Sequence, residues 1–159
     1  MTYEPRPGDY GVVKTKGWLG FIIRLGTMSR WNHAFIYVGG GHIVEANPSG
    51  VEFQPLHYSR VAWNQHEELT EEQRSMIVTH ARQSVGRNYS FVTIALIILR
   101  ILGVKALANM KILRSLGEKD GYICSELVSE CYSKAGYDIC DKPDYETVPG
   151  DLAERLIYQ

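Results

Sequence analysis

Three consecutive glycines, Gly39-Gly40-Gly41, lie between two stretches rich in β-branched and aromatic residues. Glycine accepts the positive φ angles that tight turns require, so this run predicts a hairpin in which residues 34–38 pair with residues 42–46. An antiparallel hairpin fixes which side chains of its two strands share a face. The hairpin therefore restricts the rest of the fold to elements that can pack on those faces.

The expected register of this hairpin brings two ionisable side chains together. If Val38 faces His42, the numbers of paired residues sum to eighty, and His33 pairs with Asn47. Side chains alternate between the two faces of a strand, so His33 and Glu45 then project from the same face as diagonal neighbours, while His42 lies on the opposite face. A shift of one residue in this register would separate His33 from Glu45.

Further strands and helices are predicted around the hairpin. Thr70 and Gln73 have the spacing of a capping box, which predicts a helix over residues 71–85 with Gly86 as its C-terminal stop. Apolar residues recur at helical spacing after Cys124. The remaining expectations are strands at residues 10–13, 51–54 and 61–63, a buried helix within residues 17–26, and a cysteine helix that ends at Gly136.

Cys124 lies in the first turn of its predicted helix. A cysteine becomes a useful nucleophile as a thiolate, which a helix N-terminus and a neighbouring imidazolium both stabilise. We expect His33 to serve as that imidazole and Glu45 to hold its second nitrogen, which makes Cys124, His33 and Glu45 a candidate catalytic triad. Trp31 and Tyr122 are expected beside it as substrate contacts.

Each of these residues also has an ordinary structural interpretation. A cysteine near a helix start is more often a small buried hydrophobe than a nucleophile. Taken alone, His33 could be a hydrogen-bonded core histidine, Glu45 a solvated strand residue, and the two aromatic side chains simple core packing. The functional interpretation rests on their occurring together with matching roles.

Composition restricts the class of protein. The chain has 159 residues, enough for one ordinary domain, and a formal net charge of -1, which gives no field that would draw it to nucleic acid. Its three cysteines contain no C-x-x-C pair, and its five histidines lack the spacing of a zinc site, so we expect neither a disulfide framework nor a metal. The first residues do not resemble a signal peptide, which predicts a cytoplasmic protein, or a virion component if the source is a phage.

A hydrophobic and basic segment covers residues 91–119. Residues 91–104 are almost wholly apolar but too few to cross a bilayer, and Lys105, Lys111 and Arg114 follow them. This segment is either an amphipathic insertion that rests on a membrane or covers a site, or a buried helix followed by a solvated basic face. The sequence leaves both alternatives open, as it does the oligomeric state.

Taken in order, the short motifs of this chain resemble those of the circularly permuted NlpC-type, papain-like hydrolases of the YiiX kind. The histidine motif precedes the cysteine motif, as in the permuted group. The motifs are Pro7-Gly8-Asp9, Trp31-Asn32-His33, Ile36-Tyr37-Val38-Gly39, Ile43-Val44-Glu45-Ala46, Gly50-Val51, Gly86 with Tyr89, Cys124-Ser125-Glu126-Leu127-Val128 and Pro149-Gly150-Asp151-Leu152.

The resemblance implies a single papain-like α+β domain over residues 1–159, with an antiparallel sheet packed against the cysteine helix. It also implies a cysteine peptidase or amidase that needs no cofactor and acts on a peptide or peptidoglycan-type amide. The distantly related lecithin retinol acyltransferases suggest an alternative, an acyl hydrolase or acyltransferase at a membrane surface. A third alternative is a catalytically silent module that binds peptides or cell-wall fragments.

Overall fold

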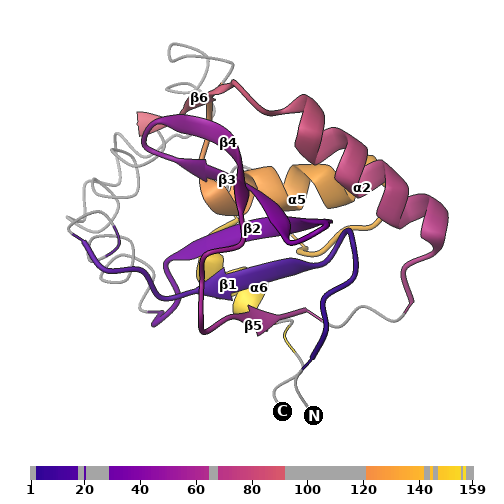
Figure 1. Ribbon diagram of the computed structural model, residues 1–159, viewed down its shortest axis with the longest axis horizontal. Coiled ribbons are helices and arrows are strands. Elements are labelled where there is room, and N and C mark those ends of the chain that lie inside the picture. Colours follow the sequence, from indigo (N-terminus) through magenta and orange to yellow (C-terminus); the bar gives the residue numbers. More distant parts are fainter. Residues whose placement is uncertain are drawn as a thin grey trace.

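A five-stranded antiparallel sheet in the order β4-β3-β2-β1-β5 forms the centre of the molecule (Figure 1). The computed structural model describes residues 3–17, 20, 29–64, 68–91, 121–141, 144, 147–154 and 156. The strands predicted at residues 10–13, 51–54 and 61–63 are all present, the last as a two-residue edge strand. The bounds are β1 Tyr10–Val13, β2 His33–Gly39, β3 His42–Asn47, β4 Gly50–Pro55 and β5 Ala62–Trp63.

The register of the β2–β3 hairpin follows the expected sum over its middle. Phe35 pairs with Glu45, and Tyr37 pairs with Ile43. His33, two residues before Phe35, therefore projects from the same face of the sheet as Glu45. The face shared by these two side chains, on which the candidate site depends, is confirmed.

The turn of the hairpin differs from the prediction. His42 pairs with Gly39 and not with Val38, and the register shifts between residues 37 and 39. Gly39, Gly40 and Gly41 all have positive φ angles, of 88°, 61° and 75°, and because Gly39 pairs with His42, Gly40 and Gly41 form the loop. A two-residue loop with positive φ at both positions matches the twist of the flanking strands, and the register shift next to Gly39 restores the expected pairing from Tyr37 onward.

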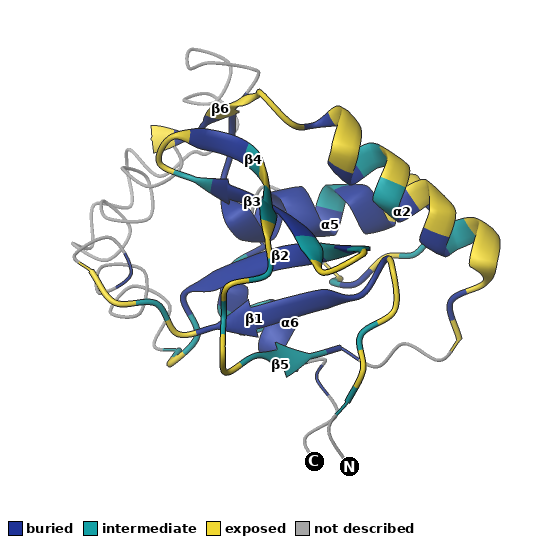
Figure 2. Cartoon of the chain, in the orientation of Figure 1, coloured by how far each residue is buried: buried dark blue, intermediate teal, exposed yellow. Residues whose placement is uncertain are grey.

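Helix α2, Glu71–Gln83, confirms the predicted capping box. The Thr70 hydroxyl accepts the backbone N–H of Gln73 at 3.1 Å, and the Gln73 side chain accepts the backbone N–H of Thr70 at 3.0 Å. The helix ends two residues earlier than expected, and Gly86 follows with a φ of 88°. Its inner face carries buried Ile77 and Ala81 (Figure 2).

Helix α5, Cys124–Lys134, packs against β2, β3 and α2 and is buried over most of its length (Figures 1 and 2). Leu127, Val128 and Tyr132 join its buried face to the main hydrophobic core. Gly136, with a φ of 73°, follows its end as predicted. Helix α6, Pro149–Glu154, packs against α5 and β1.

A short parallel pair of strands leads into α5. Strand β6, Asn88–Tyr89, pairs with β7, Gly121–Tyr122, and Tyr89 lies opposite Tyr122. The backbone N–H of Ser90 also donates to the carbonyl of Tyr122 at 3.0 Å. These bonds fix the chain immediately before Cys124, so the start of α5 lies next to Tyr89.

Two predicted segments fall mainly outside the described residues. Of the buried helix expected within residues 17–26, the structure describes only Gly17 and Gly20, and of residues 91–119 it describes only Phe91, which is exposed. In the part of the chain that the structure does describe, no helix is both long and apolar enough to span a bilayer.

A buried ion pair joins the start of the sheet to α2. The Asp9 carboxylate accepts Arg74 Nη1 at 2.8 Å, and both side chains are at most 5% exposed. The second carboxylate oxygen of Asp9 accepts hydrogen bonds from the Tyr3 hydroxyl and the Arg6 backbone N–H, both at 2.7 Å. A buried charge without its partner is costly, so this pair holds α2 in place over the sheet.

Replacing Arg74 with Met should lower the free energy of unfolding by about 3 kcal/mol, because the Asp9 carboxylate would stay buried without its counter-charge. Urea unfolding followed by circular dichroism measures the change. Arg82→Met, on the exposed side of the same helix, is the matched control and should cost less than about 1 kcal/mol. Equal effects of the two substitutions would contradict a structural role for the ion pair.

Candidate active site

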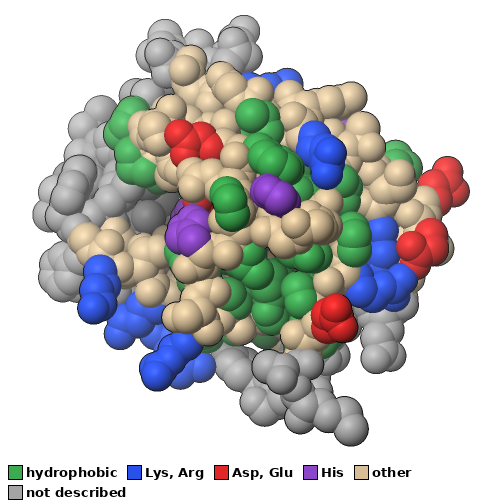
Figure 3. All heavy atoms as spheres, in the orientation of Figure 1, with side chains coloured by type: hydrophobic (Ala, Val, Ile, Leu, Met, Phe, Trp, Pro, Cys, Tyr) green, Lys and Arg blue, Asp and Glu red, His purple; other side chains and the backbone are tan. Residues whose placement is uncertain are grey.

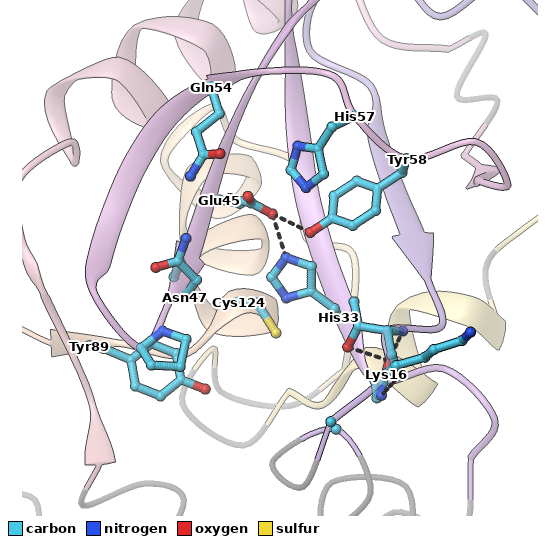
Figure 4. A pocket seen from close by; sticks show the side chains of 15 residues that line it. Lys16, His33, Glu45, Asn47, Gln54, His57, Tyr58, Tyr89 and Cys124 are labelled. Atoms are coloured by element: carbon cyan, nitrogen blue, oxygen red, sulfur yellow. Dashed lines mark hydrogen bonds and ion pairs between the residues drawn. The ribbon is translucent and has the colours of Figure 1, made fainter.

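Three elements bring Cys124, His33 and Glu45 to one cavity (Figure 4). His33 is the first residue of β2, Glu45 lies in the middle of β3, and Cys124 is the first residue of α5. The cavity has a volume of about 400 Å³. Its walls are mostly small or polar residues: Thr15, Lys16, Gly17, Gly20, Asn32, His33, Glu45, Ala46, Asn47, Pro48, Gln54, His57, Tyr58, Tyr89 and Cys124.

His33 and Glu45 are joined by a short hydrogen bond. His33 Nε2 lies 2.6 Å from Glu45 Oε2, and the two residues are 8% and 2% exposed. The second ring nitrogen, Nδ1, is thereby left to face Cys124 (Figure 4). Glu45 thus fixes the orientation of the imidazole in the way expected from the sequence.

The electrostatics of the cavity favour a protonated His33. Burial favours the neutral imidazole, but the charge of Cys124 and its hydrogen bond, followed by the hydrogen bond and charge of Glu45, outweigh burial and raise the pKa of His33 to about 10. Burial by itself would raise the pKa of Glu45. The hydrogen bond and charge of His33, with the Tyr58 hydrogen bond, nevertheless hold the pKa of Glu45 below its usual range.

The start of α5 supplies a favourable environment for negative charge at Cys124. The first intrahelical bond runs from the Leu127 N–H to the Ile123 carbonyl, so the N–H groups of the first turn have no acceptor within the helix. Together with the helix dipole, these groups favour an anion at the helix N-terminus. Cys124, at the start of α5, therefore lies between these N–H groups and the imidazole of His33.

Trp31 and Tyr122 are not among the residues that line the cavity. Tyr122 is 4% exposed, and its hydroxyl accepts Arg87 Nη1 at 2.6 Å while the Arg87 guanidinium lies over its ring. Trp31 packs at the edge of the main core with Arg30 over its ring. The structure thus brings together the three expected triad residues but not the two expected substrate contacts.

Tyr58, His57 and Tyr89 line the cavity although the sequence did not single them out as site residues. Tyr58 donates its hydroxyl to Glu45 Oε2 at 2.8 Å, and the ring of His57 packs on it. His57 is exposed, and Figure 3 shows histidine side chains on the surface of this face. Tyr58 and His57 follow β4 in an irregular segment, where no periodicity of the sequence reports which way a side chain points.

The other two cysteines lie away from this cavity. Cys131 is 2% exposed, and burial, followed by the Glu130 charge, raises its pKa to about 12. Cys140 is half-buried in the irregular segment that follows α5. Among these thiols, that of Cys124 lines the cavity and interacts with the imidazole of His33.

No protein-family model matches the chain. The chain is similar to the probable lipoprotein peptidase YaeF of Escherichia coli (strain K12). The two sequences are 26% identical over an alignment 176 residues long, which covers 96% of this chain. The chain spans 64% of the length of YaeF.

Among solved structures, the fold is similar to that of the metalloprotein YiiX from Escherichia coli O157:H7. The TM-score is 0.64 at 21% identity, and the match covers 86% of this chain and 70% of YiiX. This likeness confirms the predicted α+β fold with an antiparallel sheet packed on the cysteine helix. Among the residues described for this chain, no three His, Cys, Asp or Glu side chains are placed to hold a metal ion together.

The raised pKa of His33 predicts a histidine that keeps its proton well above neutral pH. NMR titration of its imidazole signals should give a midpoint near pH 10. Cys124→Ala should lower this midpoint by about one unit or more, because the sulfur makes the largest contribution that raises it, whereas Cys131→Ala should leave it unchanged. Since the folded-state pKa lies above the ordinary value of 6.5, the associated stability is present below pH 6.5 and is lost as the pH rises toward 10.

Proposed function

We propose that this protein is a cysteine hydrolase that cleaves an amide bond, in a peptide or a peptidoglycan-type peptide, through a thioester intermediate. The single observation that carries the proposal is the placement of Cys124, at the start of a helix, beside an imidazole that Glu45 holds from its other side. A nucleophile, a base and an orienting group in this order are the components of acyl transfer.

Acylation uses the ion pair of Cys124 and His33. The thiolate sulfur attacks the carbonyl carbon of the amide and forms a tetrahedral intermediate. The carbon–nitrogen bond then breaks, the imidazolium of His33 gives its proton to the leaving amine, and a thioester on Cys124 remains. Glu45 keeps the ring in place throughout and stabilises its charged form.

Deacylation returns the enzyme to its starting state. Neutral His33 accepts a proton from a water molecule whose oxygen attacks the thioester carbonyl. The carbon–sulfur bond breaks, the acyl group leaves as a carboxylic acid, and Cys124 regains the thiolate that pairs with protonated His33. The reaction therefore requires His33 to be an acid in one half and a base in the other.

The oxyanion of the tetrahedral intermediate needs donors next to the sulfur. The backbone N–H of Cys124, in the first turn of α5, supplies one of them. Tyr89 lines the same cavity, and burial, followed by the Cys124 charge, raises the pKa of its hydroxyl, which therefore stays protonated. In this proposal the Tyr89 hydroxyl is the second donor.

The comparisons support the same class of reaction. YaeF is named a probable lipoprotein peptidase, and the alignment with it covers nearly the whole of this chain. Peptide-bond hydrolysis is therefore the activity that both the similarity and the geometry of Cys124 favour.

Alkylation with iodoacetamide tests the nucleophile without a substrate. Mass-spectrometric mapping should find Cys124 modified rapidly below pH 7, with Cys131 and Cys140 as internal controls that react slowly. His33→Ala should abolish this rapid reaction, because the imidazolium that stabilises the thiolate is gone. If Cys124 reacted no faster than the other two thiols, the nucleophile would be disproved and a binding module favoured.

The acetyl ester of p-nitrophenol tests the two-step chemistry. Wild-type protein should release one equivalent of p-nitrophenolate in a burst, followed by slower turnover, and Cys124→Ala should lose the burst. Glu45→Gln should reduce the rate about 100-fold and leave measurable activity, because it alters only the support of the imidazole. Cys140→Ala is the control and should match wild type; equal activity of Cys124→Ala and wild type would disprove the mechanism.

A further inference from the structure

Tyr58 contacts the same carboxylate oxygen that holds His33. Its hydroxyl donates to Glu45 Oε2 at 2.8 Å, and His33 Nε2 lies 2.6 Å from that oxygen (Figure 4). Two donors therefore converge on one oxygen of a carboxylate that is 2% exposed. The charge of Glu45 is shared between a phenol and an imidazole.

The ring of Tyr58 is fixed independently of its hydroxyl. It stacks on Phe35 of β2, with ring centroids 5.2 Å apart and planes inclined by 13°. The imidazole of His57 packs against it at 4.1 Å, and the ring of His33 lies 5.9 Å away. Because these contacts immobilise the ring, the hydroxyl meets Glu45 without further loss of side-chain entropy.

We propose that Tyr58 is a positioning residue, which fixes the Glu45 carboxylate by its hydroxyl and limits how firmly Glu45 holds the proton on His33. The inference deepens the proposed function and rests on it for its catalytic meaning. It adds a member to the site that neither the sequence nor the comparisons assign.

The physical reason is a difference in hydrogen-bond strength between two states. When His33 is protonated, the imidazolium already neutralises Glu45, and the phenol adds little. When His33 is neutral, Glu45 is a lone buried carboxylate, and the phenol is a strong donor to it. Tyr58 thus stabilises the state with neutral His33 more than the state with protonated His33.

Deacylation is the step on which this difference acts. The thiolate is absent from the thioester intermediate, so the contacts of His33 with Glu45 and its surroundings now determine whether His33 is neutral and able to accept the proton of water. A carboxylate without Tyr58 would keep His33 protonated to a higher pH and slow the attack of water. The rate of acylation, which begins from protonated His33, depends less on this effect.

The test is an NMR titration of His33 in Cys124→Ala protein, which reproduces the absence of the thiolate. Addition of Tyr58→Phe keeps the ring and removes only the hydroxyl, and it should raise the His33 midpoint by about 0.5 pH unit. Addition of Tyr37→Phe is the matched control and should leave the midpoint unchanged. Tyr37 and Tyr58 pack in the same small hydrophobic cluster around Phe35, but the Tyr37 hydroxyl accepts the Gly41 N–H and not a contact from Glu45.

A second substitution keeps the test decisive if Tyr58→Phe does not fold. Fluorotyrosine at position 58 retains the phenol and makes it a stronger donor, so the His33 midpoint should move down instead of up. An unchanged or lowered midpoint in folded Tyr58→Phe protein, or an unchanged one with fluorotyrosine, would overturn the inference.

The acetyl ester assay separates this inference from the proposed function. In protein with Cys124 intact, Tyr58→Phe should leave the burst in place. The acidic limb of the pH–rate profile of the slow turnover should move by about 0.5 pH unit to higher pH. If wild type showed no burst that depends on Cys124, the proposed hydrolase activity would fail. The His33 titration would still decide whether Tyr58 controls the proton on that residue.

Discussion

The register of one β-hairpin is the constraint on which the candidate site depends. Pairing of Phe35 with Glu45 places His33 and Glu45 on one face of the sheet, and a slip of one residue would turn Glu45 to the other face. The two-residue turn at Gly40 and Gly41 pairs Gly39 with His42, and the shift between Tyr37 and Gly39 that follows it gives the register at the site.

The opposite face of the sheet, which carries Ile36 and Val44, packs on α5, and the start of that helix reaches the site. The buried face of α5 packs on β2, β3 and α2, while the pairing of Tyr89 with Tyr122 fixes the residues just before Cys124. The first turn of α5 thus meets the cavity at a defined place. The Asp9–Arg74 ion pair secures α2, which packs against both α5 and β2.

Burial gives the site its electrostatic character. Water screens charges weakly inside such a cavity, so Cys124, His33 and Glu45 affect one another more strongly than they would on the surface. Burial alone would favour neutral forms of His33 and Glu45, yet the Cys124 charge and hydrogen bond on His33, followed by the contacts between His33 and Glu45, reverse this preference and favour the charged forms. The hydroxyl of Tyr58 adds a neutral donor to this set of charges, which is how a residue outside the triad can influence it.

The sequence by itself determined the strands around the glycine turn, the capping box of α2, the cysteine helix, and the shared face of His33 and Glu45. These features follow from local rules: φ preferences, strand alternation and helical periodicity. The tertiary structure alone decided that Gly39 joins the strand, and that Tyr58 and Tyr89, not Trp31 and Tyr122, reach the cavity. The physical reason is that residues in irregular segments, such as Tyr58, and in two-residue strands, such as Tyr89 and Tyr122, take their direction from packing between distant segments, which no local pattern of the sequence encodes.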